Sequence, residues 1–141
     1  MNKTVLKSLI VLFMVLFVQL GNQHDAKAGD IYMGEYSNGQ VAYLDTSSIR
    51  TDNHYVQGYH EGDTYSCLVK AVWPNSDQYD EVSYEFYIGQ TVGIKKNGKQ
   101  IYHTMKGALD FFDKNPVEKN LWAFFQRKHE QEWSKIPERI R

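Results

Sequence analysis

The most reactive side chains of the sequence are a single cysteine and five histidines. A cysteine nucleophile needs a lowered pKa and a nearby histidine that accepts its proton. Cys67 instead lies in an apolar, strand-like run together with Tyr65 and Val69. A cysteine in that setting behaves as a small buried hydrophobe. The sequence therefore predicts a core position for Cys67 and no catalytic residue at this point of the chain.

Metal binding is the second chemistry that the histidines offer. A zinc site needs three or four ligands, which usually include a pair close together in sequence. We expect His54 and His60 to share one strand, where they would stand roughly 20 Å apart and could not chelate one ion. His129 begins the segment HEQEW, which lacks the second histidine four residues later that a zinc-protease helix requires. The sequence therefore predicts no metal and no cofactor.

Carboxylates offer further chemistries. Asp77, Asp80 and Glu81 form an acidic loop without the ligand spacing of a calcium loop, so a solvated loop is expected. Asp45 stands beside Ser47 without a G-x-S-x-G elbow, and both residues fit a turn in which side chains bond to backbone N–H groups. A carboxylate pair for glycoside hydrolysis need not be close in sequence, so that chemistry stays open.

The N-terminal segment predicts export. Two lysines precede an apolar run over residues 8–21, and a small-x-small sequence follows at residues 26–28. The run is shorter than the roughly 20 residues that span a bilayer, and the whole pattern is typical of a secretory signal peptide. We expect residues 1–28 to be removed, leaving no membrane span; an uncleaved membrane anchor is the alternative. Residues 29–141 then form one exported domain that is periplasmic, secreted or at the cell surface.

Composition narrows the class of protein. The chain has 141 residues, of which 42% are hydrophobic, 23% charged and 14% aromatic, and its net charge is −1. These values exclude a collagen-like chain, a disordered tail and a disulfide-dense mini-scaffold. The near-neutral charge gives no basic surface, so no nucleic-acid partner is predicted. An exported domain with one cysteine has no internal disulfide, which is typical of a bacterial protein.

The elements that must position these residues follow from periodicity. Residues 45–49 and 61–63 are expected to interrupt the strands as turns. Strands are expected at residues 31–45 with a two-residue turn at Asn38-Gly39, at 54–60, 64–73 and 81–89, and at 91–105 with a second turn at Asn97-Gly98 that pairs Ile94 with Ile101.

The period changes from two to 3.6 after residue 105 and predicts two helices. The first covers residues 107–114, and the second begins at Asn115 and ends before Pro137. Asn115 is the expected cap, with Pro116 in the first turn and Glu118 three residues after the cap. The element order predicts an α+β fold: an antiparallel meander sheet of about six or seven strands covered by one or two C-terminal helices. A small curled barrel with a helix in one end is the alternative.

The first hairpin predicts a binding face. A type I′ turn at Asn38-Gly39 pairs Met33 with Leu44 on one face and places Tyr32, Tyr36 and Tyr43 on the other. If the helix covers the Met33 face, the tyrosines are left for solvent or a partner. Tyrosine suits interfaces because its ring is apolar and its hydroxyl polar. The alternative is that tyrosine simply favours strands.

The segment GDIYMGEYSNGQVAYLDTSSIR carries Tyr43, Asp45, Ser48 and Ile49 in a Y-x-D-x-x-S-I pattern. It resembles the opening of bacterial exported domains of the surface-adhesin protein E type. The resemblance covers the first half of the chain after residue 28 and implies a non-enzymatic surface or periplasmic domain that binds host proteins. That family's pattern has an early tryptophan, paired cysteines and no matching helical C-terminus, so no binding residue is transferred.

Three classes of function follow. The first is a non-enzymatic binding or adhesion module of the bacterial envelope or secretome, whose partner is a protein or a cell-surface ligand. The second is a small exported enzyme or an enzyme inhibitor with an unrecognised site. The third is an envelope component that oligomerises through a free strand edge. The lack of a catalytic motif favours the first class.

Overall fold

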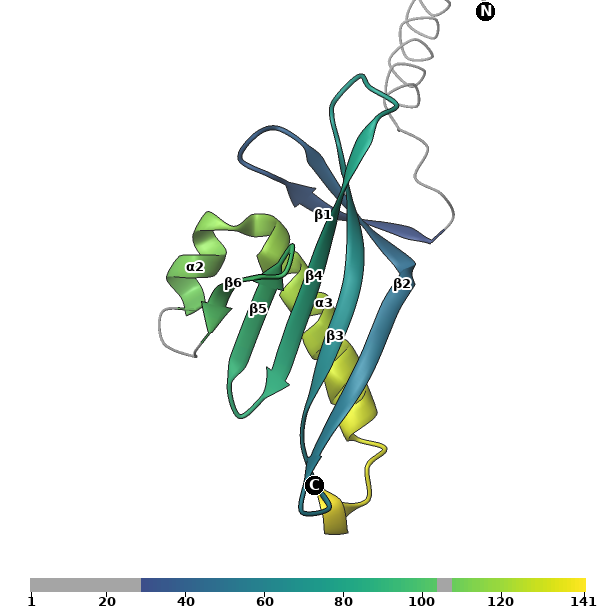
Figure 1. Ribbon diagram of the computed structural model, residues 1–141, viewed down its shortest axis with the longest axis vertical. Helices are drawn as coiled ribbons and strands as arrows, with labels where there is room; N and C mark the ends of the chain where they lie inside the picture. Colours follow the sequence, from purple (N-terminus) through teal and green to yellow (C-terminus); the bar gives the residue numbers. More distant parts are fainter. Residues whose placement is uncertain (1–28, 104–107) are drawn as a thin grey trace, which may run out of the picture.

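A computed structural model describes residues 29–103 and 108–141, and the predicted signal peptide lies outside these residues. Strands in sequence order form one antiparallel sheet, and two helices follow (Figure 1). The elements are β1 (Asp30–Glu35), β2 (Val41–Val56), β3 (Tyr59–Val72), β4 (Tyr79–Gly89), β5 (Val92–Lys96), β6 (Lys99–His103), α2 (Ala108–Lys114), α3 (Pro116–Trp133) and the 3-10 helix η1 (Glu138–Ile140).

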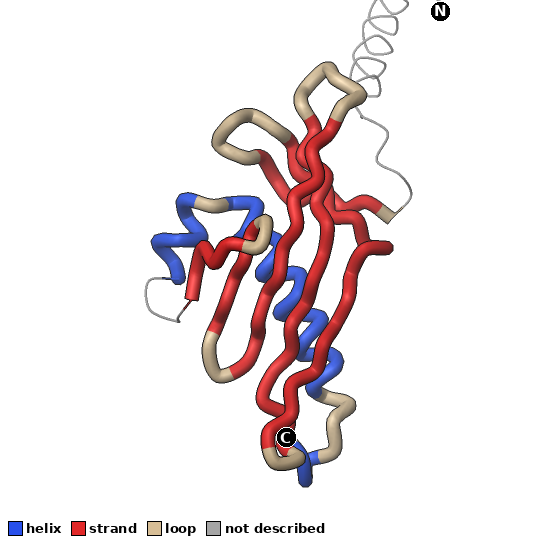
Figure 2. The backbone as a smooth tube through the Cα atoms, viewed as in Figure 1, coloured by secondary structure: helices blue, strands red, loops and turns tan. Residues whose placement is uncertain are grey.

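The sheet is an open meander with the order β1-β2-β3-β4-β5-β6, so β1 and β6 are its edges. Helix α3 runs across one face of the long strands, and no helix of the described residues covers the other face, which we call the uncovered face (Figure 2). The predicted α+β meander is therefore confirmed, with six strands in the described residues and α3 as the main helix. The curled barrel is wrong, because the sheet does not close.

The core lies between α3 and the covered face. Strict alternation along β3 and β4 turns one set of side chains toward the helix, and the helical spacing of Val117, Leu121 and Phe125 forms the facing stripe. The centre of the Phe125 ring lies 5.2 Å from the centre of the Tyr65 ring and 5.3 Å from that of the Phe86 ring. All five of these side chains are buried, so aromatic packing joins the two layers.

Two tight turns have positive φ at both central residues. Asn97 and Gly98 have φ of 49° and 75°, which confirms the predicted turn between β5 and β6. Gln57 and Gly58 have φ of 51° and 84° and join β2 to β3. The turn predicted at residues 61–63 is therefore wrong, because the chain reverses before His60 and these residues continue β3.

The first hairpin has a longer loop than predicted. The Tyr36 N–H donates to the Gln40 carbonyl over 2.8 Å, and only Gly39 of the intervening residues has a positive φ, of 90°. This loop has three residues and a glycine in the left-handed region, whereas a type I′ turn needs two positive φ values.

Bulges also shift two predicted registers. Leu44 pairs with Ile31, two residues before the expected partner, and Ile94 pairs with Tyr102 and not with Ile101. The β1–β2 pair and the β5–β6 pair each contain one register shift, in which an extra residue stands opposite one partner. For Leu44, the three-residue loop accounts for one residue of the shift and the bulge for the other. For Ile94, the bulge accounts for the whole shift, and periodicity alone cannot locate such an insertion.

The predicted break at residues 45–49 is a bulge within a continuous strand. Pairing between β2 and β3 is interrupted from Asp45 to Arg50 and then resumes. The Asp45 carboxylate accepts hydrogen bonds from the Ser47 N–H over 3.0 Å and the Ser47 hydroxyl over 2.6 Å. The Ser48 hydroxyl accepts from the Leu68 N–H over 2.8 Å. These contacts confirm the side-chain-to-backbone role and show why the strand is not broken.

Candidate functional site

Tyrosines cluster on the uncovered face of the sheet. The rings of Tyr32 and Tyr43 meet edge to face with centroids 6.0 Å apart. The Lys70 ammonium lies 5.9 Å from the centre of the Tyr79 ring. Tyr32 is 59% and Tyr79 is 52% exposed. We call these four residues the tyrosine patch.

Lys70 is held in place beneath this surface. Its ammonium donates to the Asp30 carboxylate over 2.8 Å, and this hydrogen bond raises the pKa of Lys70. Tyr43 stands directly opposite Lys70 in the β2–β3 pair. The patch therefore combines a large aromatic area, which is a feature enriched in protein interfaces, with a lysine whose charge is paired with Asp30.

Tyr36 lies on the other face, contrary to the prediction. Pairing of β1 with β2 shifts between Tyr32 and Gly34, so Met33 is an extra residue. Gly34 has φ of 114°, a conformation that favours glycine. A bulge of this kind turns the following residues to the opposite face. As a result, the Tyr36 hydroxyl lies 3.1 Å from that of Tyr84, on the helix side of the sheet.

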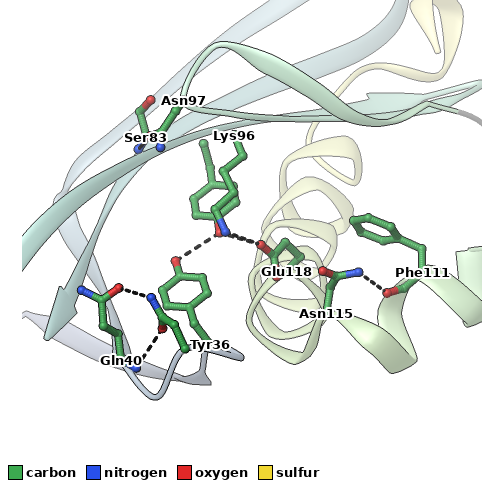
Figure 3. Close-up of polar contacts among 10 residues, drawn as sticks. Tyr36, Gln40, Ser83, Lys96, Asn97, Phe111, Asn115 and Glu118 are labelled. Carbon is green, nitrogen blue, oxygen red and sulfur yellow. Dashed lines mark hydrogen bonds and ion pairs between the residues drawn. The ribbon is translucent and has the colours of Figure 1, made fainter. Parts of the chain in front are cut away.

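Tyr36 belongs to a polar network between sheet and helix (Figure 3). The Tyr84 hydroxyl donates to the Glu118 carboxylate over 2.7 Å, and the Lys96 ammonium donates to the same oxygen over 3.1 Å. The ammonium also lies 4.4 Å from the centre of the Tyr36 ring. Burial is the main cause that raises the pKa of both tyrosines, so both phenols stay protonated at neutral pH.

Glu118 differs from its predicted role as a helix cap. Asn115 does occupy the cap position before Pro116, but its side chain makes no capping hydrogen bond. The Asn115 amide instead donates to the Phe111 carbonyl over 2.7 Å, and Glu118 is only 3% exposed. Pro116 still begins the helix, while Glu118 faces the sheet. The capping-box pattern therefore located the helix start correctly and misassigned the carboxylate.

A buried histidine cluster lies at the far end of α3. The Asp63 carboxylate accepts from His60 Nε2 and from His129 Nδ1, each over 2.7 Å. The Tyr65 hydroxyl donates to Asp63 over the longer distance of 3.4 Å, and burial raises the pKa of Tyr65. Asp63 is 1% exposed, so two imidazoles supply the hydrogen bonds of a carboxylate that water does not reach.

An open groove borders this cluster. Its volume is about 690 Å³. Aromatic rings from both the sheet and the helix line it, together with carboxylates, an amide and a guanidinium. The lining residues are Tyr59, His60, Glu61, Gly89, Gln90, His129, Glu130, Trp133 and Arg141.

The prediction that His54 and His60 share one strand is wrong. The reversal at Gln57-Gly58 puts His54 in β2 and His60 in β3. His54 Nε2 lies 2.7 Å from the Thr64 hydroxyl beside a second hollow, whereas His60 is buried under Trp133. Sequence reasoning missed the histidine cluster because its members come from segments that only the fold brings together.

The remaining predictions concern thiol and metal chemistry. Cys67 is 3% exposed, and burial raises its pKa to about 12, so a core position is confirmed and the thiol stays protonated. Across residues 29–103 and 108–141, no three His, Cys, Asp or Glu side chains are grouped to hold a metal ion. In the acidic segment, Asp80 accepts from the Gln40 amide over 2.7 Å.

Within the described part of the chain, no helix has both the length and the apolar character needed to cross a membrane.

Comparison with known proteins gives no match to a family model, to a curated protein or to a solved structure. The geometry of the molecule therefore carries the functional argument.

Proposed function

We propose that this chain is an exported, non-enzymatic binding module that binds a protein partner through its tyrosine patch. The observation that carries the proposal is the division of the sheet. Helix α3 covers one face, while the other presents Tyr32, Tyr43 and Tyr79 around Lys70. Rigid aromatic side chains on a flat sheet lose little conformational entropy on binding and bury a large area.

The export part of the proposal is supported by the pattern of residues 1–28, and the partner class by the chemistry of the patch. Tyr32 and Tyr79 expose more than half of their surface, and Lys70 supplies a charge that Asp30 keeps in place. Exposed tyrosines suit a partner surface that carries apolar side chains, and the Lys70–Asp30 pair suits polar groups at the edge of that surface. The carbon-rich rings give affinity and the cation gives orientation.

Tyr36 is not part of this proposal, because it packs on the helix side with Tyr84. Its substitution would disturb the fold and would not report on binding. The proposal therefore keeps Tyr32 and Tyr43 and adds Tyr79 and Lys70.

Site-specific photocrosslinking in the native envelope or culture fluid tests the proposal. A photoreactive amino acid at Glu81, which pairs with Lys70 in the β3–β4 ladder, should crosslink one defined protein. The double substitution Tyr32→Ala with Tyr79→Ala should lower that crosslink by at least about tenfold while the thermal melt is unchanged. The same probe at the exposed Gln126 on α3 is the matched control and should give no such product. An undiminished crosslink in the double variant would refute the proposal.

A further inference from the structure

The groove beside the histidine cluster has walls from three separate parts of the fold. Tyr59 is the first residue of β3, Gln90 lies in the turn after β4, and Trp133 is the last residue of α3. The β2–β3 hairpin and the C-terminal segment lie at the same end of the molecule (Figure 1). A volume of about 690 Å³ falls within the range of small-molecule sites.

Its aromatic rings differ from core rings in their exposure. Tyr59 is 57% exposed, and Trp133 is partly exposed although it packs 5.2 Å from the His60 ring. The contact with His60, and a second one with His129 at 5.9 Å, fix the indole at the groove wall. Tyr59 and Trp133 therefore both offer flat apolar surfaces to a ligand.

The polar side chains of the groove mix donors with acceptors. Glu61 and Glu130 can only accept when ionised, Arg141 can only donate, and Gln90 does both. Arg141 already donates to the carbonyls of residues 134 and 136, which holds its guanidinium against the C-terminal segment. With two carboxylates and one guanidinium, the excess is a single negative charge. This balance disfavours a phosphate, which needs several cations, and a strongly basic peptide, which needs several anions.

One buried atom beside the groove lacks a partner. His60 Nε2 lies 2.7 Å from a carboxylate oxygen of Asp63, so Nδ1 is the ring nitrogen that this contact leaves over. Among the buried side-chain nitrogens and oxygens of the described residues, His60 Nδ1 alone has no hydrogen bond. A hydroxyl is the kind of group that suits this nitrogen, because it donates as well as accepts.

We propose that this groove binds a carbohydrate. A pyranose ring has apolar C–H faces that pack on Tyr59 and Trp133, and hydroxyl groups that both donate and accept, as the surrounding side chains require. The site is separate from the tyrosine patch, which lies on the uncovered face of the sheet. The proposal therefore does not depend on the proposed protein partner.

Titration of the ¹⁵N-labelled protein with cellotriose, chitotriose and maltotriose tests the inference. At millimolar sugar, the indole N–H of Trp133 and the amide of Gln90 should shift, while the indole N–H of Trp73, 44% exposed and outside the groove lining, should not. Trp133→Ala should lower the affinity for the trisaccharide by about 10- to 30-fold. Trp73→Ala is the matched control and should leave the affinity unchanged.

Three results would overturn the inference. The first is that none of the three trisaccharides shifts the indole N–H signal of Trp133. The second is that the Trp133→Ala protein binds the trisaccharide as tightly as the original chain. The third is that trilysine or triglutamate shifts these signals more than the sugars do. If Trp133→Ala does not fold, the exposed Tyr59→Ala and Gln90→Ala answer the same question and should each weaken binding by at least about threefold. The tyrosine-patch double variant should keep its sugar binding, so failure of either proposal is seen separately.

Discussion

At the scale of single residues, Glu118 holds the helix and the sheet together through polar contacts. Its carboxylate is 4% exposed and accepts from Tyr84 and Lys96, whose ammonium also packs on the Tyr36 ring. A buried carboxylate costs free energy unless it is paired and hydrogen-bonded, and here both conditions are met. The network therefore favours the one arrangement in which Glu118 of α3 faces Tyr84 of β4 and Lys96 of β5.

Substitution of Glu118 tests this role. Glu118→Ala leaves the Tyr84 hydroxyl and the Lys96 ammonium without their acceptor, and we expect the free energy of unfolding to fall by about 2–4 kcal/mol. Gln126→Ala, an exposed position on the same helix, should change it by less than about 0.5 kcal/mol. Urea unfolding at neutral pH measures both. A Glu118→Ala protein as stable as the control would show that the network is not a determinant of stability.

At the scale of elements, two glycines set how closely β3 approaches β4. Gly62 pairs with Gly89, and a Cβ atom at Gly62 would lie 2.6 Å from the Ile88 carbonyl oxygen. A backbone oxygen cannot move aside as a flexible side chain can. Gly62 is followed by Asp63, and Gly89 lines the groove, so this close approach lies beside both features. Gly62 is thus required for packing and not for a turn.

The substitution Gly62→Ala should therefore destabilise the protein by about 1–3 kcal/mol, because β3 and β4 must separate. Gly93→Ala is the matched control. Gly93 also lies in a strand without a positive φ, and its nearest neighbour would be 3.5 Å from the new Cβ. The control should be neutral or slightly stabilising, since alanine lowers the entropy of the unfolded chain. Equal thermal midpoints for the two variants would contradict the packing role.

The elements also show what the sequence could and could not predict. Clean alternation in β4, the helical stripe of α3 and the turn at Asn97-Gly98 are local patterns, and each predicted its element correctly. The turn at Gln57-Gly58 has no such signature, because glutamine rarely adopts a positive φ. Because this reversal was missed, the strand boundaries around it were predicted wrongly, and His60 was assigned to the same strand as His54.

The candidate sites follow the same division. Tyr32 and Tyr43 were correctly placed together on one face, since cross-strand neighbours follow from alternation. The bulge before Gly34 moved Tyr36 to the other face. A glycine inside a strand-like run is a local sign of a bulge, but alternation of side chains alone does not report it. The bond between Asp63 and His129 joins residues 66 positions apart, which depends on how α3 docks. Contacts of this range are set by tertiary packing and are not encoded in periodicity.

At the scale of the whole molecule, one sheet supports three surfaces with different chemistry. The covered face is closed by aromatic packing and by the Glu118 network. The uncovered face carries the tyrosine patch, and the end beyond α3 carries the groove. Because the two candidate sites share no residue, substitutions in one should leave the other intact.

The buried tyrosines make the stability of the whole fold sensitive to alkaline pH. Burial raises the pKa of Tyr36, Tyr65 and Tyr84 above the usual 10.0, so the unfolded chain loses these protons first. Their contribution to stability is therefore fully present below about pH 10 and is lost as the pH rises above it, by up to about 1.4 kcal/mol per pH unit for each tyrosine. Urea unfolding at a series of pH values should show a plateau up to about pH 9 and a steep fall above pH 10.

In the folded protein, absorbance at the phenolate band should show fewer than the full set of 10 tyrosines ionising near pH 10, and the rest only on unfolding. Tyr84→Phe should reduce the slope, whereas ionisation of every tyrosine near pH 10 with the fold intact would show that these phenols are not buried.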